Sequence, residues 1–423
     1  MNKLKDNKFY PWLVVGMLII VSLLNYLDRQ MLATMRPYMM EDIKELQSIT
    51  NFGRLMAIFL WTYALMSPIS GIIADKLNRK WLIVFSLFVW SFVTLCMGYV
   101  HDIELLYVLR GIMGISEAFY IPAALSLTAD YHQGKTRSVA IGALTSGIYL
   151  GQAIGGFGAT LSAHTTWQFT FHFFGLIGII YSIVLIFFLR EKKTYLVQKS
   201  NKLTFKGILN ANFGGLAILF TNISFWVMLF YFAALNLPGW TTKNWLPTML
   251  SESLNMKMEF AGPISTVTLA LSSFVGVFIG GVISDKWVQK KLKGRIYTSS
   301  LGLSMIIPAL LLMSFGNGLV TIVSAAVIFG LGFGMYDTNN MPILCQFIPS
   351  RYRATGYGLM NFVGIAAGAL ITDILGKAFE ADYKNIVFLV MILAVALSVF
   401  LQLRILNPKT VDMTDELMEE SNK

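Results

Sequence analysis

The chain has 423 residues, of which 56% are hydrophobic and only 13% are charged, and its mean hydropathy is +0.63. This composition excludes a soluble globular domain and indicates an integral membrane protein. The formal net charge of +10 would suit a nucleic-acid-binding protein. In a chain this apolar we attribute the charge to the excess of Lys and Arg in cytoplasmic loops, and we expect no nucleic-acid partner.

Twelve apolar stretches are long enough to cross a bilayer as helices, which takes roughly 20 residues. No small-residue cleavage site follows the first stretch, so we interpret it as a retained helix rather than a signal peptide. We predict an all-α integral membrane protein with spans at 11–36, 52–74, 81–100, 103–130, 138–161, 168–189, 222–250, 259–284, 296–315, 319–345, 355–376 and 384–406.

The distribution of Lys and Arg predicts the orientation of these spans. With the N-terminus inside, 24 of these residues fall on the cytoplasmic side and seven on the opposite side, while Arg29 and Arg110 remain within spans. Cytoplasmic loops carry such an excess, so both termini are predicted to be cytoplasmic. We expect a multi-pass protein of the inner (plasma) membrane that contacts the lipid bilayer and functions as a monomer.

The first span carries two adjacent opposite charges, in the stretch NYLDRQML at 25–32. A charge inside a bilayer costs at least about 2.5 kcal/mol. Asp28 and Arg29 therefore need partners or a water-filled cavity, as do Arg110 and Glu117 in the fourth span and Asp337 in the tenth. Arg29 and Arg110 each lie about 10 Å deep, at ~1.5 Å per residue. Asp28 and Arg29 are ~100° apart around their helix and cannot point at one target.

Two internal echoes predict a duplicated architecture. GIIADKLNRK begins at Gly71 and GVISDKWVQKKLKGR begins 210 residues later, and an Arg five residues before a Gly recurs at the fifth and eleventh spans with an offset of 216. A parallel repeat of six helices is the layout of a large class of secondary transporters. We predict two pseudo-symmetric six-helix halves, 1–189 and 214–423, joined by a cytoplasmic linker at 190–213.

The first loop echo resembles the loop motif of the major facilitator superfamily, Gly-x-x-x-Asp-Arg/Lys-x-Gly-Arg-Arg/Lys. The resemblance extends over essentially the whole chain and implies the major facilitator fold, with this loop acting as a cytoplasmic gating latch between the halves. Asn78 replaces the second Gly of the motif, and we expect a mild effect because Asn also tolerates a left-handed backbone. The matching residues are Gly71, Asp75, Lys76, Arg79 and Lys80.

Two branches of that superfamily share features with the chain. NYLDRQML and RGIMGISEAFYIPA, at Arg110–Ala123, resemble the anion:cation symporters, which include sialin, vesicular glutamate transporters and bacterial carriers of galactonate and hexuronates. FLWTYALMSPISG in the second span and KNWLPTML in the seventh add to this resemblance. MYDTNNMP and RATGYGLMNF instead resemble the spinster-like carriers of lipids and other amphiphiles, so both branches stay open.

The charged residues suggest a coupling mechanism. We expect Arg29 to face the central cavity and hold an anionic substrate, while Asp28 turns toward Arg110 and shares a proton-dependent charge network with Glu117. A carboxyl group removed from water can take up and release a proton near neutral pH. The resemblance to sugar-acid carriers implies the same roles, a substrate-binding Arg and proton-binding carboxylates. The alternative is an Asp28–Arg110 ion pair that only fixes helix packing.

Other polar groups in the spans either contact a hydroxylated substrate or join neighbouring helices. The resemblance to galactonate carriers favours three of them, Tyr63, Gln152 and Asn361, as substrate contacts. Gly147, Gly151 and Gly155 have the spacing of four that lets helices approach closely. No role is assigned to Asp337, and Lys243 is expected to be an interface lysine. The full set of amides and phenols is Tyr26, Tyr63, Gln152, Asn339, Asn340 and Asn361.

No enzyme signature is present in the sequence. It lacks the complete Gly-x-x-x-x-Gly-Lys-Ser/Thr phosphate loop, and its four His lack metal-ligand spacing, so we expect neither cofactor nor metal. Cys96 and Cys345 lie in apolar spans and are expected to be unpaired. The sequence predicts a proton-coupled symporter that imports a hydroxylated organic anion, a sugar acid or a uronate-containing small saccharide. A spinster-like carrier or exporter of amphiphiles, lipids or drugs is the alternative.

Overall fold

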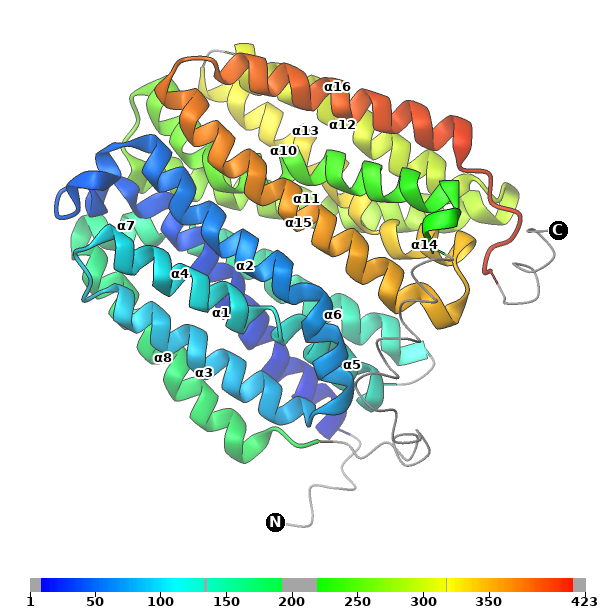
Figure 1. Ribbon diagram of the computed structural model, residues 1–423, viewed down its shortest axis with the longest axis horizontal. Helices are drawn as coiled ribbons and strands as arrows, with labels where there is room; N and C mark the ends of the chain where they lie inside the picture. Colours follow the sequence, from blue (N-terminus) through cyan, green and yellow to red (C-terminus); the bar gives the residue numbers. More distant parts are fainter. Residues whose placement is uncertain (1–8, 133–134, 192–218, 317, 414–423) are drawn as a thin grey trace. The chain divides into compact units, whose positions relative to one another are not determined.

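A computed structural model describes residues 9–132, 135–191, 219–316 and 318–413, and within these ranges every regular element is helical (Figure 1). The helices are α1 (Tyr10–Met39), the 3-10 helix η2 (Lys44–Gln47), α2 (Ile49–Lys76), α3 (Arg79–Met97), α4 (Ile103–Glu117), α5 (Tyr120–Tyr131), α6 (Lys135–Gly155), α7 (Gly158–His164), α8 (Trp167–Phe188), α10 (Ile223–Leu254), α11 (Met258–Lys290), α12 (Gly294–Phe315), α13 (Leu319–Asp337), α14 (Asn340–Phe347), α15 (Ser350–Glu380) and α16 (Lys384–Ile405).

The twelve predicted membrane spans are confirmed. Within the described residues, twelve helical stretches are long and apolar enough to cross a membrane, and their ends lie within a few residues of the predicted ones. Three spans are interrupted, between α4 and α5, α6 and α7, and α13 and α14. Pro122 and Pro342 follow two of these breaks, and a proline cannot donate to the carbonyl four residues before it. The interruption therefore follows from the sequence at both places.

The chain packs into two compact units. Unit 1 comprises Met1–Thr194, Lys243–Ala270 and Thr372–Asp382, and unit 2 comprises Tyr195–Thr242, Leu271–Ile371 and Tyr383–Lys423. Unit 1 thus combines the first six spans with one end of α10, α11 and α15. The predicted linker at 190–213 lies outside the described residues except for its first two, and the division into halves at 1–189 and 214–423 stays a prediction.

Glycines bring α1 and α6 together in unit 1, where the two helices run side by side (Figure 1). A Cβ on Gly147 would lie 2.5 Å from the carbonyl oxygen of Ile19, and a Cβ on Gly151 would lie 2.2 Å from that of Leu23. Such distances leave no room for a side chain, because backbone atoms cannot move aside independently. The glycine row predicted to serve packing therefore sets the close approach of the helix that carries Arg29.

Replacing Gly151 by alanine should destabilise unit 1. Inserting a methyl group into a packed contact commonly costs about 1–3 kcal/mol, and here it must separate α6 from α1. We expect a lower apparent melting temperature of the purified protein in detergent. Gly142→Ala on the same helix is the matched control, since a Cβ there meets nothing within 4 Å and alanine favours helix over glycine by about 1 kcal/mol. Equal melting temperatures for the two variants would contradict this account of the packing.

Polar contacts hold the ends of α10, α11 and α15 against the first-half helices within unit 1. The Glu380 carboxylate accepts hydrogen bonds from the Ser48 hydroxyl at 3.0 Å and from the backbone N–H of Thr50 at 3.2 Å, which satisfies the N-terminus of α2. Gln30 donates to the carbonyl of Lys243 at 2.7 Å, and Thr160 donates to that of Glu259 at 2.7 Å. These contacts explain why the three helix ends belong to unit 1.

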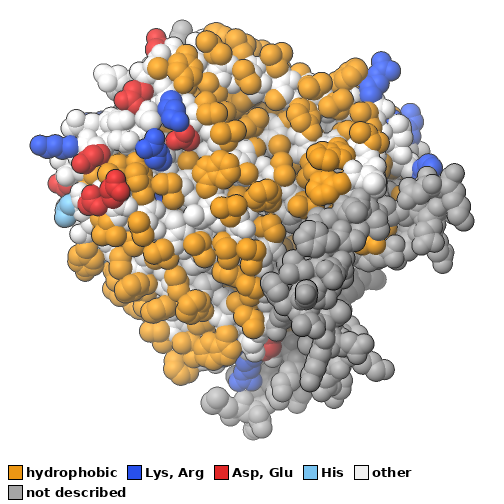
Figure 2. Space-filling view, viewed as in Figure 1, with side chains coloured by type: hydrophobic (Ala, Val, Ile, Leu, Met, Phe, Trp, Pro, Cys, Tyr) orange, Lys and Arg blue, Asp and Glu red, His pale blue; other side chains and the backbone are white. Residues whose placement is uncertain are grey.

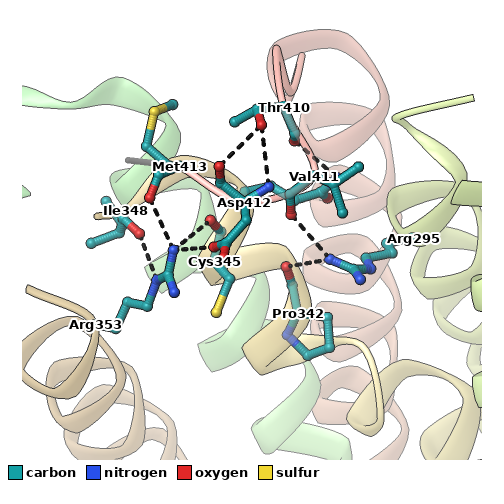
Figure 3. Close-up of polar contacts among 10 residues, drawn as sticks. Arg295, Pro342, Cys345, Ile348, Arg353, Thr410, Val411, Asp412 and Met413 are labelled. Carbon is teal, nitrogen blue, oxygen red and sulfur yellow. Dashed lines mark hydrogen bonds and ion pairs between the residues drawn. The ribbon is translucent and has the colours of Figure 1, made fainter. Parts of the chain in front are cut away.

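Residues 410–413 are held against other parts of unit 2 by polar contacts (Figure 3). Arg353 at the start of α15 donates to the carbonyls of Ile348, Cys345 and Met413 at 2.9, 3.3 and 3.0 Å and pairs with the carboxylate of Asp412. The backbone N–H of Met413 in turn donates to the carbonyl of Cys345 at 2.9 Å. The Arg of the second sequence echo therefore ties residues 410–413 to the end of α14.

The described surface is suited to a lipid environment. Figure 2 shows hydrophobic side chains over most of the visible face, with charged side chains gathered toward its margins. Many large apolar residues are exposed, among them Phe85, Phe187 and Leu393 at 67%, 69% and 69%. Such exposure is unusual for a soluble monomer and expected for helices that face lipid tails. The chain is a multi-pass membrane protein.

Candidate functional site

A buried ion pair joins Arg29 and Glu117 within unit 1. Arg29 Nε on α1 lies 2.6 Å from Glu117 Oε2 on α4, and the two side chains are only 8% and 0% exposed. Asp102 fixes the start of α4 because its carboxylate accepts from the backbone N–H of Leu105 at 2.9 Å. α4 runs from Ile103 to Glu117 and ends immediately before the break in its span.

Aromatic rings surround the Arg29 guanidinium. Its central carbon lies 4.8 Å from the ring centroids of Tyr26 and Phe59 and 4.7 Å from that of Tyr63. Arg110 approaches the same Phe59 ring at 4.5 Å. A ring face attracts a cation by up to about 2 kcal/mol when both are desolvated. The rings therefore hold the guanidinium in place and stabilise its charge without neutralising it.

Asp28 and Arg110 lie within electrostatic range of each other but form no direct ion pair in this structure. No ion pair within 4.0 Å joins these two residues, both of which the structure describes. Asp28 Oδ2 instead accepts from the Thr94 hydroxyl on α3 at 3.2 Å, and Arg110 Nη1 contacts the sulfur of Met113 at 3.1 Å. Asp28 and Arg29 thus contact different helices, α3 and α4, as the ~100° between them requires. Their roles in proton coupling and substrate binding stay predictions.

The four charged groups still act on one another. Asp28, Arg29, Arg110 and Glu117 lie within electrostatic range of each other and are all nearly excluded from solvent. Two guanidinium groups and two carboxylates balance when both acids are ionised. Buried charges are tolerated only when such compensation exists. Neutralising one carboxylate therefore leaves the cluster with one excess positive charge, which favours a bound anion.

Arg29 has donor capacity beyond its partner. Its Nη2 atom is buried and has no hydrogen-bond acceptor among the described residues, and the same is true of Arg110 Nε. A guanidinium offers five N–H donors in a planar fork that matches a carboxylate. The cluster can therefore bind a carboxylate group through Arg29, most readily when Glu117 releases it.

The other predicted site residues divide between the two units. Tyr26 and Tyr63 join the Arg29 cluster, whereas Gln152 is buried on α6, where its Nε2 has no partner among the described residues. In unit 2, Asn339 accepts from Ser284 on α11 and donates to the carbonyl of Met335 at 2.8 Å, a helix-joining role. Asn340 donates to Asp337, and Asn361 is half-buried on α15.

The loop motif forms an ion pair and a hydrogen bond to neighbouring helices. Arg79 pairs with Asp130 at the end of α5, and Lys80 Nζ donates to the carbonyl of Ile186 at 2.8 Å. Asn78 has an extended backbone with a φ of −64°, and its side chain caps α3 by accepting from the N–H of Trp81 at 3.2 Å. Gly71 lies on α2 in open space, and the side chains of Asp75 and Lys76 lie outside the described residues.

Sequence reasoning missed two members of the cluster. Phe59, which lies between the two Arg residues, and Thr94, which donates to Asp28, both resemble ordinary residues of an apolar helix. Phe59 does precede Tyr63 by one helical turn, and their rings lie 6.0 Å apart. That spacing was the only feature of the sequence that could have indicated Phe59, because nothing in the sequence shows which helices face each other.

Comparisons with known proteins find relatives that are named as transporters. The chain is 26% identical over 397 residues to the probable galactarate/D-glucarate transporter of Escherichia coli (strain K12), covering 86% of this chain and 87% of that one. It is 24% identical over 413 residues to the hexuronate transporter of Bacillus subtilis (strain 168), covering 93% of each. Both relatives are named as transporters of acidic sugars.

Solved structures agree on the fold. A bacterial homologue of the human lysosomal transporter Spinster, in an inward-facing and occupied conformation, superposes with a TM-score of 0.76 at 20% identity, over 97% of this chain and all of that one. Residues 18–372 also match the Major Facilitator Superfamily. The repeated loops, the twelve spans and this match over most of the sequence establish that the chain is a membrane transporter, not an enzyme, and belongs to the Major Facilitator Superfamily.

Proposed function

We propose that the chain is a proton-coupled symporter that imports a hydroxylated organic anion, a sugar acid or a uronate-containing small saccharide. The observation that carries this proposal is the buried Arg29–Glu117 ion pair, which offers one group for an anion and one for a proton in direct contact. Relatives named as transporters of galactarate, D-glucarate and hexuronate support the substrate class. The positive-inside pattern supports cytoplasmic termini in the inner membrane.

Coupling follows from competition for one guanidinium. Glu117 and the substrate carboxylate both need Arg29, so an ionised Glu117 opposes anion binding. A proton on Glu117 removes that competition and leaves Arg29 free to hold the substrate. By linkage, the bound anion favours the proton to the same extent. Once the anion leaves toward the cytoplasm, Glu117 releases its proton and pairs with Arg29 again, which keeps the empty site neutral.

The surrounding residues have supporting roles in this proposal. The rings of Tyr26 and Tyr63 adjoin Arg29, and we propose that their hydroxyls meet the hydroxyl groups of a sugar acid. Gln152 offers a buried amide donor. Asp28 and Arg110 keep the cluster balanced beside the exchanging pair. We propose that the loop motif, through the Arg79–Asp130 ion pair, acts as the cytoplasmic latch.

Uptake into liposomes tests the proposal. The purified full-length protein would be reconstituted with an acidic exterior and offered labelled sugar acids, neutral sugars and lysolipids in parallel. We expect at least one sugar acid to accumulate above its external concentration, and a protonophore should abolish the accumulation. Transport of lysolipids without any response to the sugar acids would reject the proposal in favour of an amphiphile carrier.

A further inference from the structure

A nine-residue pattern occurs in both halves of the sequence, within the fourth and tenth spans. Gly-x-x-acid-x-x-x-x-Pro is found at residues 114–122 and again at 334–342, a displacement of 220 residues. This displacement is close to the 210 and 216 residues that separate the two loop echoes, as expected for one duplicated six-helix unit. Glu117 and Asp337 therefore occupy the same position of the repeat.

The local structure of the two positions is also the same. α4 ends at Glu117 and α13 ends at Asp337, and the next helix of each span begins three residues later. The residue after each acid has a backbone carbonyl that would normally accept a helical hydrogen bond from the residue four positions later. In each pattern that later residue is the proline, which has no N–H to donate. The C-terminal end of a helix carries partial negative charge, which favours cations. In both halves a carboxylate thus lies where the backbone itself favours a positive charge.

The surroundings of Asp337 are polar and accessible. Its side chain is exposed, and its Oδ1 accepts a hydrogen bond from Asn340 Nδ2 at 3.3 Å. The phenol of Tyr336 on α13 lies within electrostatic range of Asp337, and also of Tyr231 on α10 and Tyr357 on α15. The rings of Tyr231 and Tyr336 meet edge to face at 5.6 Å, and the buried Tyr231 hydroxyl has no hydrogen-bond partner among the described residues.

Two further helices approach this end of α13 through glycines. α11 and α12 approach it through Gly280 and Gly302, where an added Cβ would lie 2.5 Å from Met335 Cα and 3.1 Å from Met335 Cβ. α11 also supplies the Ser284 hydroxyl to Asn339. The end of α13 is thus closely packed where it meets α11 and α12, while the Asp337 side chain itself is exposed.

We propose that Asp337 is a second proton-binding carboxyl group, so that the carrier moves two protons with each singly charged anion. This inference rests on the proposed symport function and extends it. The proton joins a carboxylate oxygen of Asp337 from the side of uptake and leaves from the same oxygen on the side of release, while Asn340 continues to hydrogen-bond to the carboxyl group. The second proton increases the driving force, and Glu117 alone controls access of the anion to Arg29.

A proton fits this position better than a metal ion. A hard cation such as Ca²⁺ needs six or more oxygen ligands, and within the described residues no group of three or more His, Cys, Asp or Glu could hold a metal. A proton needs one carboxylate that is accessible to water in part of the cycle. Asp337 meets that requirement in this structure, whereas Glu117 is fully buried.

The accumulation limit in proteoliposomes measures the number of protons. With the membrane potential clamped at zero, each proton moved with a singly charged anion multiplies the limiting ratio by ten for each pH unit, since a factor of ten corresponds to about 1.4 kcal/mol. A gradient of one unit should therefore give about a hundredfold accumulation in the wild type and about tenfold in Asp337→Asn. Asp382→Asn is the matched control, because this exposed residue has a φ of +55° that asparagine also tolerates, and it should keep the hundredfold limit.

The outcomes separate this inference from the symport function. A tenfold limit in the wild type, or equal limits in the wild type and Asp337→Asn, would overturn the inference and leave symport intact. A wild type without any accumulation would overturn the symport function itself. If Asp337→Asn does not fold, Asp337→Glu and Asp337→Gln replace it. The Glu variant should then reach the wild-type limit and the Gln variant a tenfold lower one, and equal limits for the pair would also reject the inference.

Discussion

Replacing Arg29 by lysine should weaken the binding of an acidic substrate although the positive charge is retained. A guanidinium meets a carboxylate with two parallel N–H donors and stays charged at every working pH, whereas an ammonium offers one point of contact. Lysine would also lose the flat surface that lies among Tyr26, Phe59 and Tyr63. Loss of a charge-assisted contact is commonly worth about 1.5–3 kcal/mol, or roughly a tenfold to 150-fold weaker affinity. Arg29→Gln should nearly eliminate binding.

The measurement compares an acidic sugar with its uncharged analogue. Both ligands would be titrated against the wild type and Arg29→Lys by calorimetry or by thermal stabilisation, since a ligand that binds the folded state raises its apparent stability. The variant should lose affinity for the acid far more than for the neutral analogue. If Arg29 only supports the fold, Arg29→Lys and Arg29→Gln should both lower the yield of folded protein. The folded protein that remains should then prefer the acid over the neutral analogue as strongly as the wild type does. That pattern would reject the anion site.

Glu117→Gln should abolish uphill transport while exchange of substrate across the membrane continues. The amide has nearly the shape of the protonated acid, so Arg29 stays available to the anion and the loaded carrier can still change conformation. After release, the variant cannot restore the Arg29–Glu117 ion pair, and a buried unpaired cation is costly. Return of the empty carrier is therefore blocked. Counterflow with labelled substrate on one side measures exchange, and accumulation under a pH gradient measures coupling.

Glu117→Asp is the matched control for this experiment. It keeps an ionisable carboxyl group and shortens the side chain by one methylene, so uphill transport should be slower but present. Uphill transport retained in full by Glu117→Gln would contradict the role of Glu117 and shift the coupling proton to Asp28 or Asp337. Loss of both exchange and accumulation in a folded Glu117→Gln protein would indicate instead that the residue is needed for substrate binding.

The membrane spans could be predicted because their signal is local. A run of apolar residues long enough to cross the bilayer is a property of the sequence alone. The helix breaks after Glu117 and Asp337 were also available in principle, since each is followed by a proline at the same spacing. They were missed because a proline near a span is more often read as a bend than as an interruption.

The partners of the buried charges could not be predicted in the same way. The 100° between Asp28 and Arg29 follows from helix geometry, but the rotation of α1 relative to α3 and α4 depends on packing. That packing includes the close contact of Gly147 and Gly151 on α6 with the backbone of α1 at Ile19 and Leu23. The estimated depth of each residue in the membrane indicated that Arg110 lies at the level of Arg29. It does not show which carboxylate contacts which guanidinium.

Proton entry driven by the substrate tests the central claim most directly. Proteoliposomes with a pH-sensitive dye inside, no pH gradient and a clamped membrane potential would receive a sugar acid that the protein transports. The account predicts that the interior becomes more acidic as the labelled acid enters, and that protein-free liposomes and an uncharged analogue give no change. Entry of the labelled acid with no change of internal pH would contradict the coupling of proton and anion through Arg29 and Glu117.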